Sequence, residues 1–329
     1  NATVVVNPIP TATIAGAIDV CVGATAPTIT FTGADGTSPY TFTYNINGGA
    51  NITVVSVGNT ATVTAPSGTA GTFDYNLVSV EDASSTVCNQ VQVGTATVVV
   101  NPIPTATIAG TIDVCVGAIA PTITFTGADG TSPYTFTYNI NGGANITVVS
   151  VGNTATVTAP TGVAGTFDYN LVSVEDASSS NCTQAQVDIA TVIVNPTPTA
   201  VISGTIDVCE GDADPTITFT GANGTAPYTF TYNINGGANQ TIVSTGNVAT
   251  ITVSTLIAGT FVYNLISVAD ASSSACSQAQ VGTATVNVNG LPTATIAGTI
   301  DVCVDDTNPT ITFTGANGIA PYTFTYNIN

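Results

Sequence analysis

The positions of the cysteines constrain this chain more than any other feature of its sequence. One set falls at Cys21, Cys115, Cys209 and Cys303, and a second set falls at Cys88, Cys182 and Cys276. Each set advances by 94 residues, and the segment 27–66 recurs letter for letter as 121–160. A fixed period without insertions is the signature of a tandem array in which every unit adopts the same fold.

Alternating apolar and polar residues indicate that each unit is built from short strands. On one expected strand, Tyr40, Phe42 and Tyr44 alternate with threonine, as expected when one face of a strand is buried. Turn signals separate the strands, among them Asn47-Gly48-Gly49 and the two-residue loop Gly58-Asn59. The first unit is expected to contain strands at 11–20 (kinked at Gly16), 28–32, 40–46, 51–57, 60–64, 72–82 and 90–100.

Seven short strands bounded by turns predict an all-β Greek-key sandwich of the immunoglobulin-like type. Joints that contain proline, such as Asn101-Pro102-Ile103-Pro104, give the expected boundaries. The fold class is therefore a tandem array of seven-stranded immunoglobulin-like sandwiches with a 94-residue repeat. The expected division is 1–8 as the end of a preceding repeat, 9–102, 103–196 and 197–290 as complete repeats, and 291–329 as the N-terminal part of a further repeat. We accordingly expect an internal stretch of a longer protein.

The composition disfavours several classes of function. The chain has 19 acidic residues and no Lys, Arg or His, which gives a formal charge of −19. A nucleic-acid partner is not expected, because no basic side chain can neutralise phosphates. An enzymatic activity is not expected either, because the usual pairs of a catalytic nucleophile and a base need His or Lys. The adjacent carboxylates Glu81 and Asp82 should point to opposite faces of a strand. Apolar runs are too short for membrane insertion.

The cysteines are expected to form disulfides, because no close pair and no His provides a zinc pattern. One pairing lies within repeats and joins Cys21–Cys88, Cys115–Cys182 and Cys209–Cys276. A second pairing follows from strand order. The first cysteine of each repeat precedes the turn after the first strand, whereas the other follows the sixth strand at the opposite end of the sandwich, roughly 33 Å away. In a head-to-tail stack this favours Cys21–Cys182 and Cys115–Cys276, and Cys88, Cys209 and Cys303 are the other cysteines expected in disulfides.

Acidic side chains near the joints make calcium a possible cofactor, and no other cofactor is expected. If consecutive repeats stack, Asp19 approaches Glu175 and Asp176, and Asp113 approaches Asp270. Carboxylates at domain joints are ligands that calcium prefers. The alternative is that these side chains are solvated turn residues that keep strand edges from pairing.

Several motifs resemble a known class of surface repeat. The series Pro10–Gly16, Val20-Cys21-Val22-Gly23, Pro39–Tyr44 and Tyr75–Val80, followed by Cys88, resembles the immunoglobulin-like or PKD-like repeats of Bacteroidota surface proteins. Among such proteins, the repeats resemble those of the giant gliding-motility adhesins of the SprB type. The resemblance implies export by the type IX secretion system and display on the outer surface, with outer-membrane anchoring through another region. Apolar Phe31 and Tyr75 stand where antibody domains carry their disulfide.

Two functions are compatible with these observations. The first is mechanical: near-identical, crosslinked units form the stiff stalk of a cell-surface adhesin or filament, which engages an extracellular surface or polysaccharide through parts not present here. Its direct partners are then the neighbouring repeats. The second is that every repeat is a weak carbohydrate-binding or surface-binding module and that the array gains avidity. The absence of insertions favours the first, since binding sites usually show unit-specific loop variation.

Overall fold

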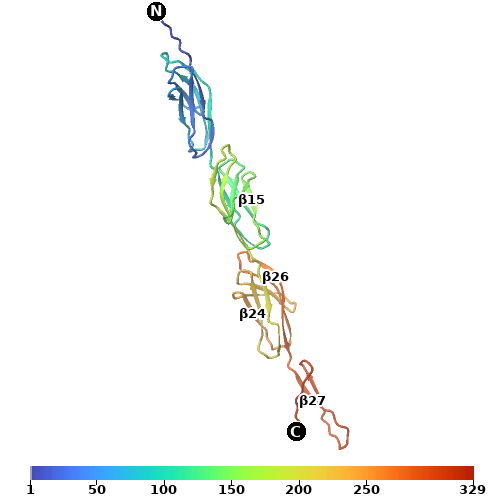
Figure 1. Cartoon of the computed structure of the whole chain (residues 1–329). Coiled ribbons are helices and arrows are strands. Elements are labelled where there is room, and N and C mark those ends of the chain that lie inside the picture. Colours follow the sequence, from blue (N-terminus) through green and yellow to red (C-terminus); the bar gives the residue numbers. More distant parts are fainter. Residues whose placement is uncertain (1) are drawn as a thin grey trace. The chain divides into compact units, whose positions relative to one another are not determined.

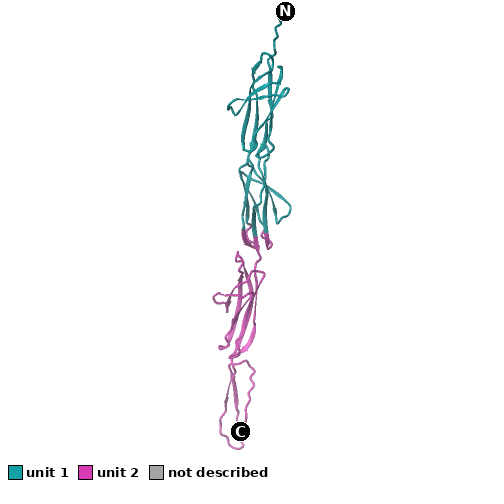
Figure 2. Ribbon diagram, turned by 90° about the vertical axis from the view of Figure 1, so that its left-hand side faces the viewer, with its two compact units in different colours: residues 1–111, 121–159, 167–192 teal, residues 112–120, 160–166, 193–329 magenta. Residues whose placement is uncertain are grey.

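All the regular structure in the computed structural model, which describes residues 2–329, is β-strand (Figure 1). None of these residues forms a helix of the length and apolar character needed to cross a membrane. The chain divides into two compact units (Figure 2). One contains 1–111, 121–159 and 167–192, and the other contains 112–120, 160–166 and 193–329. Each unit therefore includes residues from consecutive 94-residue repeats.

The first repeat is a sandwich of two sheets. The smaller sheet has the order β1-β3-β6 and is antiparallel, with β1 at Thr11–Ala15, β3 at Thr28–Ala34 and β6 at Thr60–Thr64. The larger sheet has the order β2-β9-β7-β4-β5, with β8 also paired to β7. Its strands are β2 (Ile18–Cys21), β4 (Thr41–Ile46), β5 (Ile52–Val55), β7 (Gly71–Glu81), β8 (Asn89–Val91) and β9 (Thr95–Asn101).

The same strands recur in the following repeats. The second repeat contains β10 (Thr105–Ala109), β11 (Ile112–Cys115), β12 (Thr122–Ala128), β13 (Thr135–Ile140), β14 (Ile146–Val149), β15 (Thr154–Thr158), β16 (Gly165–Glu175), β17 (Thr183–Ala185) and β18 (Ile189–Asn195). The third contains β19 (Thr199–Ser203), β20 (Ile206–Cys209), β21 (Thr216–Ala222), β22 (Thr229–Ile234), β23 (Gln240–Val243), β24 (Val248–Thr252), β25 (Gly259–Ala269) and β26 (Ser277–Asn289). Only β27 (Thr293–Ala297) and β28 (Thr312–Ala316) follow. The chain is therefore an all-β tandem array of immunoglobulin-like sandwiches.

The expected first strand is divided between the two sheets. Its first half, β1, pairs antiparallel with β3, whereas β2 pairs parallel with β9. The change occurs at Gly16, which has a φ of 118°. A Cβ there would lie 2.5 Å from the carbonyl oxygen of Thr28, so the crossing requires glycine. The switch places Cys21 beside Asn101, the last residue of β9.

The strands around Gly58-Asn59 differ from the expected hairpin. A tight turn is present, with Gly58 at a φ of 64° and a bridge between Val57 and Thr60. However, β5 pairs with β4 and β6 pairs with β3, so the flanking strands belong to opposite sheets. Ser56 favours this arrangement because its backbone N–H donates to the carbonyl of Tyr40 and its hydroxyl accepts from the Tyr40 N–H at 2.6 Å.

The expected last strand, 90–100, is interrupted in the first two repeats and continuous in the third. In the first repeat it forms β8 and β9, whereas β26 of the third spans Ser277–Asn289. The interruption coincides with an irregular pairing in which Leu77 donates to the carbonyl of Gly94 and Gln92 donates to that of Val78. In the third repeat the ladder passes the same place through a register shift between Leu265 and Ser267.

Aromatic side chains from both sheets fill the core of the first repeat. Phe31 and Phe42 are fully buried, and their ring centroids lie 5.6 Å apart. Tyr44 lies 5.0 Å from Phe31 and 6.1 Å from Tyr75. Phe31, noted in the sequence as the replacement for one cysteine, therefore connects the two sheets through aromatic packing, and Tyr75, the replacement for the other, joins the cluster through Tyr44 of its own sheet. Such pairs stabilise a core by about 0.5–1.5 kcal/mol beyond the burial of their area.

Tyr40 closes the loop that precedes its own strand, a contact the sequence analysis did not identify. Its hydroxyl donates to the carbonyl of Gly36 at 2.9 Å and accepts from the Gly36 N–H at 3.2 Å. Its ring covers Gly33, where a Cβ would lie 2.5 Å from the ring carbon Cγ. The pair Gly127 and Tyr134 repeats this packing in the second repeat. Glycine is thus required beneath the aromatic ring.

We predict that Gly127→Ala destabilises the second repeat by about 1–3 kcal/mol, because the added methyl overpacks the core against Tyr134. Chemical denaturation followed by tyrosine fluorescence measures the change. Gly162→Ala is the matched control, since a Cβ there meets no atom within 4 Å. Equal stability of the two variants would contradict the packing argument.

Candidate functional site: the disulfide junctions between repeats

Two disulfides join consecutive repeats, one in each compact unit. Cys21 of the first repeat is bonded to Cys182 of the second, and Cys115 of the second is bonded to Cys276 of the third. The Cα atoms of each pair lie 5.6 Å apart, within the usual range for a disulfide. These are the pairs that strand order favours, and no disulfide within a repeat is present among residues 2–329. Cys88, Cys209 and Cys303 are free.

The first half of each junction is a group that we call the socket. In the first repeat the socket consists of Asp19, Cys21 and Asn101, at the ends of the parallel strands β2 and β9. The backbone N–H of Val22 donates to the carbonyl of Asn101 and holds the two strand ends together. Because the chain crosses from one sheet to the other at Gly16, β2 lies beside β9. Asp19 and Cys21 therefore meet Asn101 at one edge although Asn101 is far from them in the sequence.

The second half is a loop that we call the plug, formed by residues 176–182 between β16 and β17. Its backbone is closed by a hydrogen bond from Asp176 N–H to the carbonyl of Cys182 at 3.0 Å. Asn181, directly before the cysteine, has a φ of 47°. The plugs of the first and third repeats are residues 82–88 and 270–276, which share the same closing bond. All three present Ser or Thr side chains ahead of a cysteine.

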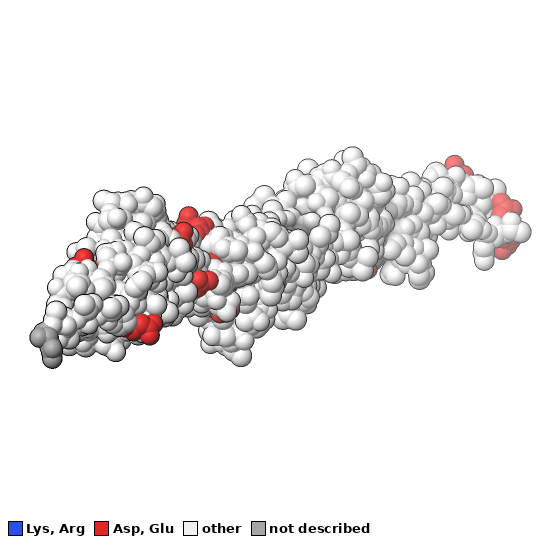
Figure 3. All heavy atoms as spheres, turned by 90° about the horizontal axis from the view of Figure 1, so that it is seen from above, with Lys and Arg blue, Asp and Glu red and all other residues white. Residues whose placement is uncertain are grey.

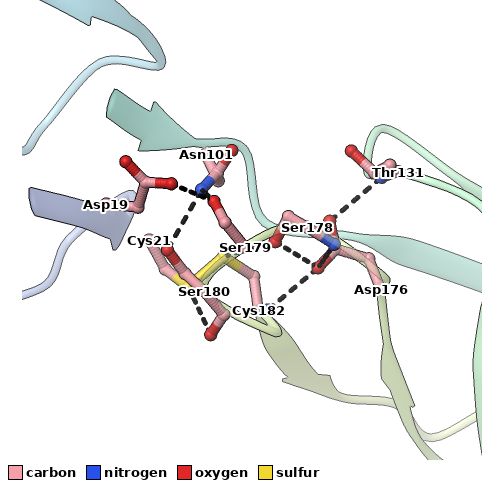
Figure 4. The surroundings of a disulfide bond; sticks show 9 residues. All are labelled: Asp19, Cys21, Asn101, Thr131, Asp176, Ser178, Ser179, Ser180 and Cys182. Atoms are coloured by element: carbon pink, nitrogen blue, oxygen red, sulfur yellow. Dashed lines mark hydrogen bonds between the residues drawn. A yellow bond between two sulfur atoms is a disulfide. The ribbon is translucent and has the colours of Figure 1, made fainter. Parts of the chain in front are cut away.

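A buried carboxylate organises the plug from within (Figure 4). Asp176 is 3% exposed, and its Oδ1 accepts from the hydroxyl of Ser178 at 2.7 Å and from the backbone N–H of Cys182 at 2.9 Å. Its Oδ2 accepts from the N–H of Thr131 at 3.0 Å, which ties the plug to a loop across the sandwich end. Because the chain contains no basic side chain, these neutral donors are the partners that make burial of the charge tolerable.

Side chains around the sulfur atoms align the two halves (Figure 4). The hydroxyl of Ser179 donates to Asp19, and the Nδ2 of Asn101 donates to the Ser180 hydroxyl at 3.0 Å. The second junction repeats the arrangement with Ser273 donating to Asp113 and Asn195 donating to Ser274 at 2.9 Å. Polar contacts of this kind fix the register of the loop on the socket, so the thiols meet in one orientation.

The acidic residues considered as calcium ligands have different surroundings in the structure. Asp19 and Asp113 each accept a serine hydroxyl, while Asp176 and Asp270 are buried within their own plugs. Glu175 is exposed on β16. Within residues 2–329, no three or more His, Cys, Asp or Glu side chains are grouped so that they could hold a metal ion. Figure 3 shows the acidic side chains of the face in view gathered at a few places on an otherwise uncharged surface. Asp19, Asp113 and Asp270 thus each accept a hydrogen bond from a serine hydroxyl.

Comparison with solved structures gives matches of low sequence identity and low TM-score. No family model and no curated protein matches the sequence. FdeC, an Escherichia coli adhesin, is 17% identical over 84% of this chain and 96% of that one, with a TM-score of 0.37. The fibronectin(III)-like modules of Clostridium thermocellum CbhA are 17% identical over 56% of this chain and 95% of theirs, with a TM-score of 0.28. The BSP domain of a biofilm-associated protein is 13% identical over 86% of this chain and 67% of that one, with a TM-score of 0.24.

Digestion after the three glutamates is expected to separate the two possible connectivities. The disulfides of the structure predict two linked peptide pairs when the free thiols are first alkylated and the unfolded, unreduced chain is cut to completion. These pairs are 1–81 with 176–210 and 82–175 with 211–329. Pairing within repeats would instead link all four peptides together. Mass spectrometry before reduction distinguishes the outcomes, and the same digest after reduction is the control.

The first plug is expected to weaken in acid. The hydroxyl of Ser84, followed by the backbone N–H of Thr37, holds the pKa of Asp82 below its ordinary value of 3.8. The stabilisation is therefore fully present above pH 3.8 and is lost as the pH falls through the lower pKa of the folded state. We predict that the difference in unfolding free energy between wild type and Asp82→Asn shrinks between pH 5 and the acid limit in urea titrations. Asp188→Asn, at an exposed position, is measured beside it as the control substitution.

Proposed function

We propose that this chain is part of the stalk of a cell-surface adhesin or filament, in which disulfide-bonded repeats resist bending and extension. The observation that carries the proposal is that both disulfides join different repeats rather than closing a single one. A bond within one sandwich would stabilise that sandwich alone. A bond between sandwiches also restricts how two neighbours move, which is a mechanical task.

The two disulfide loops overlap, and this supports the same role. Each disulfide spans 161 residues, and the segment from Cys115 to Cys182 lies inside both loops. A single backbone cut anywhere between Cys21 and Cys276 therefore leaves the two ends of the chain covalently connected. An exposed stalk benefits from this property, because one proteolytic event does not sever it.

An extracellular location belongs to the proposal, since disulfides persist in oxidising compartments and are rare in the cytosol. The charge of −19, without a single basic residue, would keep neighbouring copies apart and soluble. Export by the type IX system, outer-membrane anchoring through another region and a part in gliding motility rest on the resemblance to Bacteroidota surface repeats. The surface or polysaccharide that the whole protein engages would be bound by other parts of it, and no catalytic role is proposed.

Single-molecule pulling tests the mechanical proposal. With the disulfides intact, the shortest covalent path from Cys21 to Cys276 runs through the first disulfide, back along residues 182–115, and through the second. Complete unfolding of this region should therefore lengthen the chain by roughly a quarter of what the reduced chain gives, at about 3.5 Å per residue.

The matched variants are Cys115→Ser/Cys276→Ser, which keeps one disulfide between repeats, and Cys88→Ser, which removes a free thiol. The first should release an intermediate length, and the second should leave the force–extension curve unchanged. Equal extension of the oxidised and reduced proteins would contradict the proposed function.

A further inference from the structure

The larger sheet of every complete repeat ends in the same strand, which is paired on one side. This strand is β5 in the first repeat, β14 in the second and β23 in the third. Each pairs with the strand that precedes it in the chain, and among residues 2–329 no strand pairs with its other side. We call these three strands the open edges. The free side of such a strand presents backbone N–H and C=O groups to which a further strand can bind.

The register of the first open edge identifies its free backbone groups. The N–H of Ser56 donates to the carbonyl of Tyr40 at 2.8 Å, so this pair is bonded toward β4. In an antiparallel ladder, bonded pairs alternate with pairs whose N–H and C=O groups point away from each other. Val55 and Thr53 therefore direct their backbone groups outward. The bond from the serine recurs in the second and third repeats, so their open edges have the same register.

Other edges of the first repeat are protected, whereas the open edge is not. At β1 the backbone N–H of Ala12 donates to the side-chain oxygen of Gln92 at 3.3 Å, and β2 carries the acidic Asp19. Covering an edge or placing a charge on it are usual ways to stop further strands from pairing. Residues 51–57 contain neither a charged residue nor a proline. The open edge thus lacks the protection given to β1 and β2.

The charged residues of the chain avoid the open edges. All 19 acidic residues lie outside the segments 36–73, 130–167 and 215–269, which contain these edges. Because the chain has no basic residue, two copies repel each other wherever acidic groups meet, and they approach with least repulsion along these segments. A basic partner would be attracted to the acidic groups elsewhere. The charge pattern therefore favours a second copy of this chain as the occupant of the edge.

The side chains beside the first open edge are apolar and exposed. Val55 is 59% exposed and Val57 is 91% exposed. A groove of about 450 Å³ lies next to them, and its lining residues, which include Val54 and Ala61, come from β5, β6 and the turn between them. A strand added to β5 would place its inward-facing side chains over this groove. In a second copy these side chains are Ile52 and Val54, so the edge is complementary to itself.

We propose that the open edges are contact sites between copies of this chain, where the open edge of one copy pairs antiparallel with an open edge of another. The same surface is then used on both sides, as in most homodimers. At the first repeat, Thr53 and Val55 supply the backbone hydrogen bonds of the contact. A single contact is small, but contacts made at several repeats strengthen one another. The inference goes beyond the proposed stalk, which requires one chain only.

Sedimentation velocity of the full chain at several salt concentrations tests the contact. The protein carries Cys88→Ser, Cys209→Ser and Cys303→Ser, so that free thiols cannot link the copies. Salt screens the repulsion between acidic chains, because the Debye length falls from about 30 Å at 0.01 M to about 3 Å at 1 M. The proposed contact contains no ion pair that salt would weaken. Self-association should therefore strengthen as the salt concentration rises.

Substitutions at the open edges are compared with substitutions elsewhere that add the same charge. The edge variant is Val55→Glu/Val149→Glu/Val243→Glu, and the control variant is Val93→Glu/Val187→Glu/Val281→Glu, at exposed positions outside the open edges. Both variants gain three acidic residues, so general repulsion is matched. We expect the edge variant to self-associate roughly ten-fold more weakly than the control, because like charges would lie near each other across the paired strands.

A proline variant distinguishes strand pairing from general apolar contact. Val55→Pro/Val149→Pro/Val243→Pro removes N–H groups that point away from the neighbouring strand, and proline is tolerated at such edge positions. The variant keeps an apolar side chain and adds no charge. We expect it to lose self-association to a similar degree as the edge variant. Circular dichroism of all variants verifies that the sandwiches remain folded.

A chain that stays monomeric at every salt concentration would overturn the proposal. Equal self-association of the edge and control variants would do the same, as would a folded proline variant that associates like the unsubstituted edge. These outcomes leave the proposed stalk unaffected, since the pulling experiment reports on disulfides within one chain. Conversely, selective loss of association at the open edges together with equal extension of oxidised and reduced protein would retain the contact and remove the mechanical function.

Discussion

The buried aspartate of the plug is the interaction on which the junctions depend. A loop of seven residues does not by itself hold a cysteine in one place, because each unrestrained residue adds backbone freedom that bonding must overcome. Asp176 removes that freedom by accepting hydrogen bonds from the loop's own serine and cysteine and from Thr131 across the sandwich end. The carboxylate therefore shapes the loop, and the loop presents the sulfur.

The absence of basic residues explains why the buried plug aspartate is held by backbone N–H and hydroxyl donors. A buried carboxylate is usually paired with Arg or Lys, and this chain has neither. Several neutral hydrogen-bond donors around each carboxylate stabilise the buried charge instead. The repeat then contains no ion pair whose strength would fall with added salt. No buried side-chain oxygen or nitrogen in residues 2–329 lacks a hydrogen-bond partner. The buried polar side-chain atoms are thus hydrogen-bonded although every charged residue of the chain is acidic.

Much of the fold follows from local patterns in the sequence. Alternation along 40–46 marks β4, and the cysteine pairing favoured by strand order is the one in the structure, because strand direction alone places Cys21 and Cys88 at opposite ends. The sheet to which β5 belongs was not predictable, since it is favoured by hydrogen bonds between Ser56 and Tyr40, which lie 16 residues apart in the sequence. The loop-forming role of Asp176 and the hydroxyl contact of Tyr40 were missed for the same reason. Hydrogen bonds between a side chain and the backbone leave no periodic signal, whether the partner is distant, as Thr131 is from Asp176, or four residues away, as Gly36 is from Tyr40.

The distance along the chain between bonded cysteines also dictates an order of maturation. Cys21 can find Cys182 only after 161 further residues have emerged, so its thiol must wait while Cys88 and Cys115 appear first. Once the first repeat has folded, a disulfide between Cys21 and Cys88 is disfavoured. Cys21 lies beside the end of β9, whereas Cys88 lies past the far end of β7, a strand of 11 residues. The folded sandwich thereby favours the disulfide that joins it to the next repeat over one within itself.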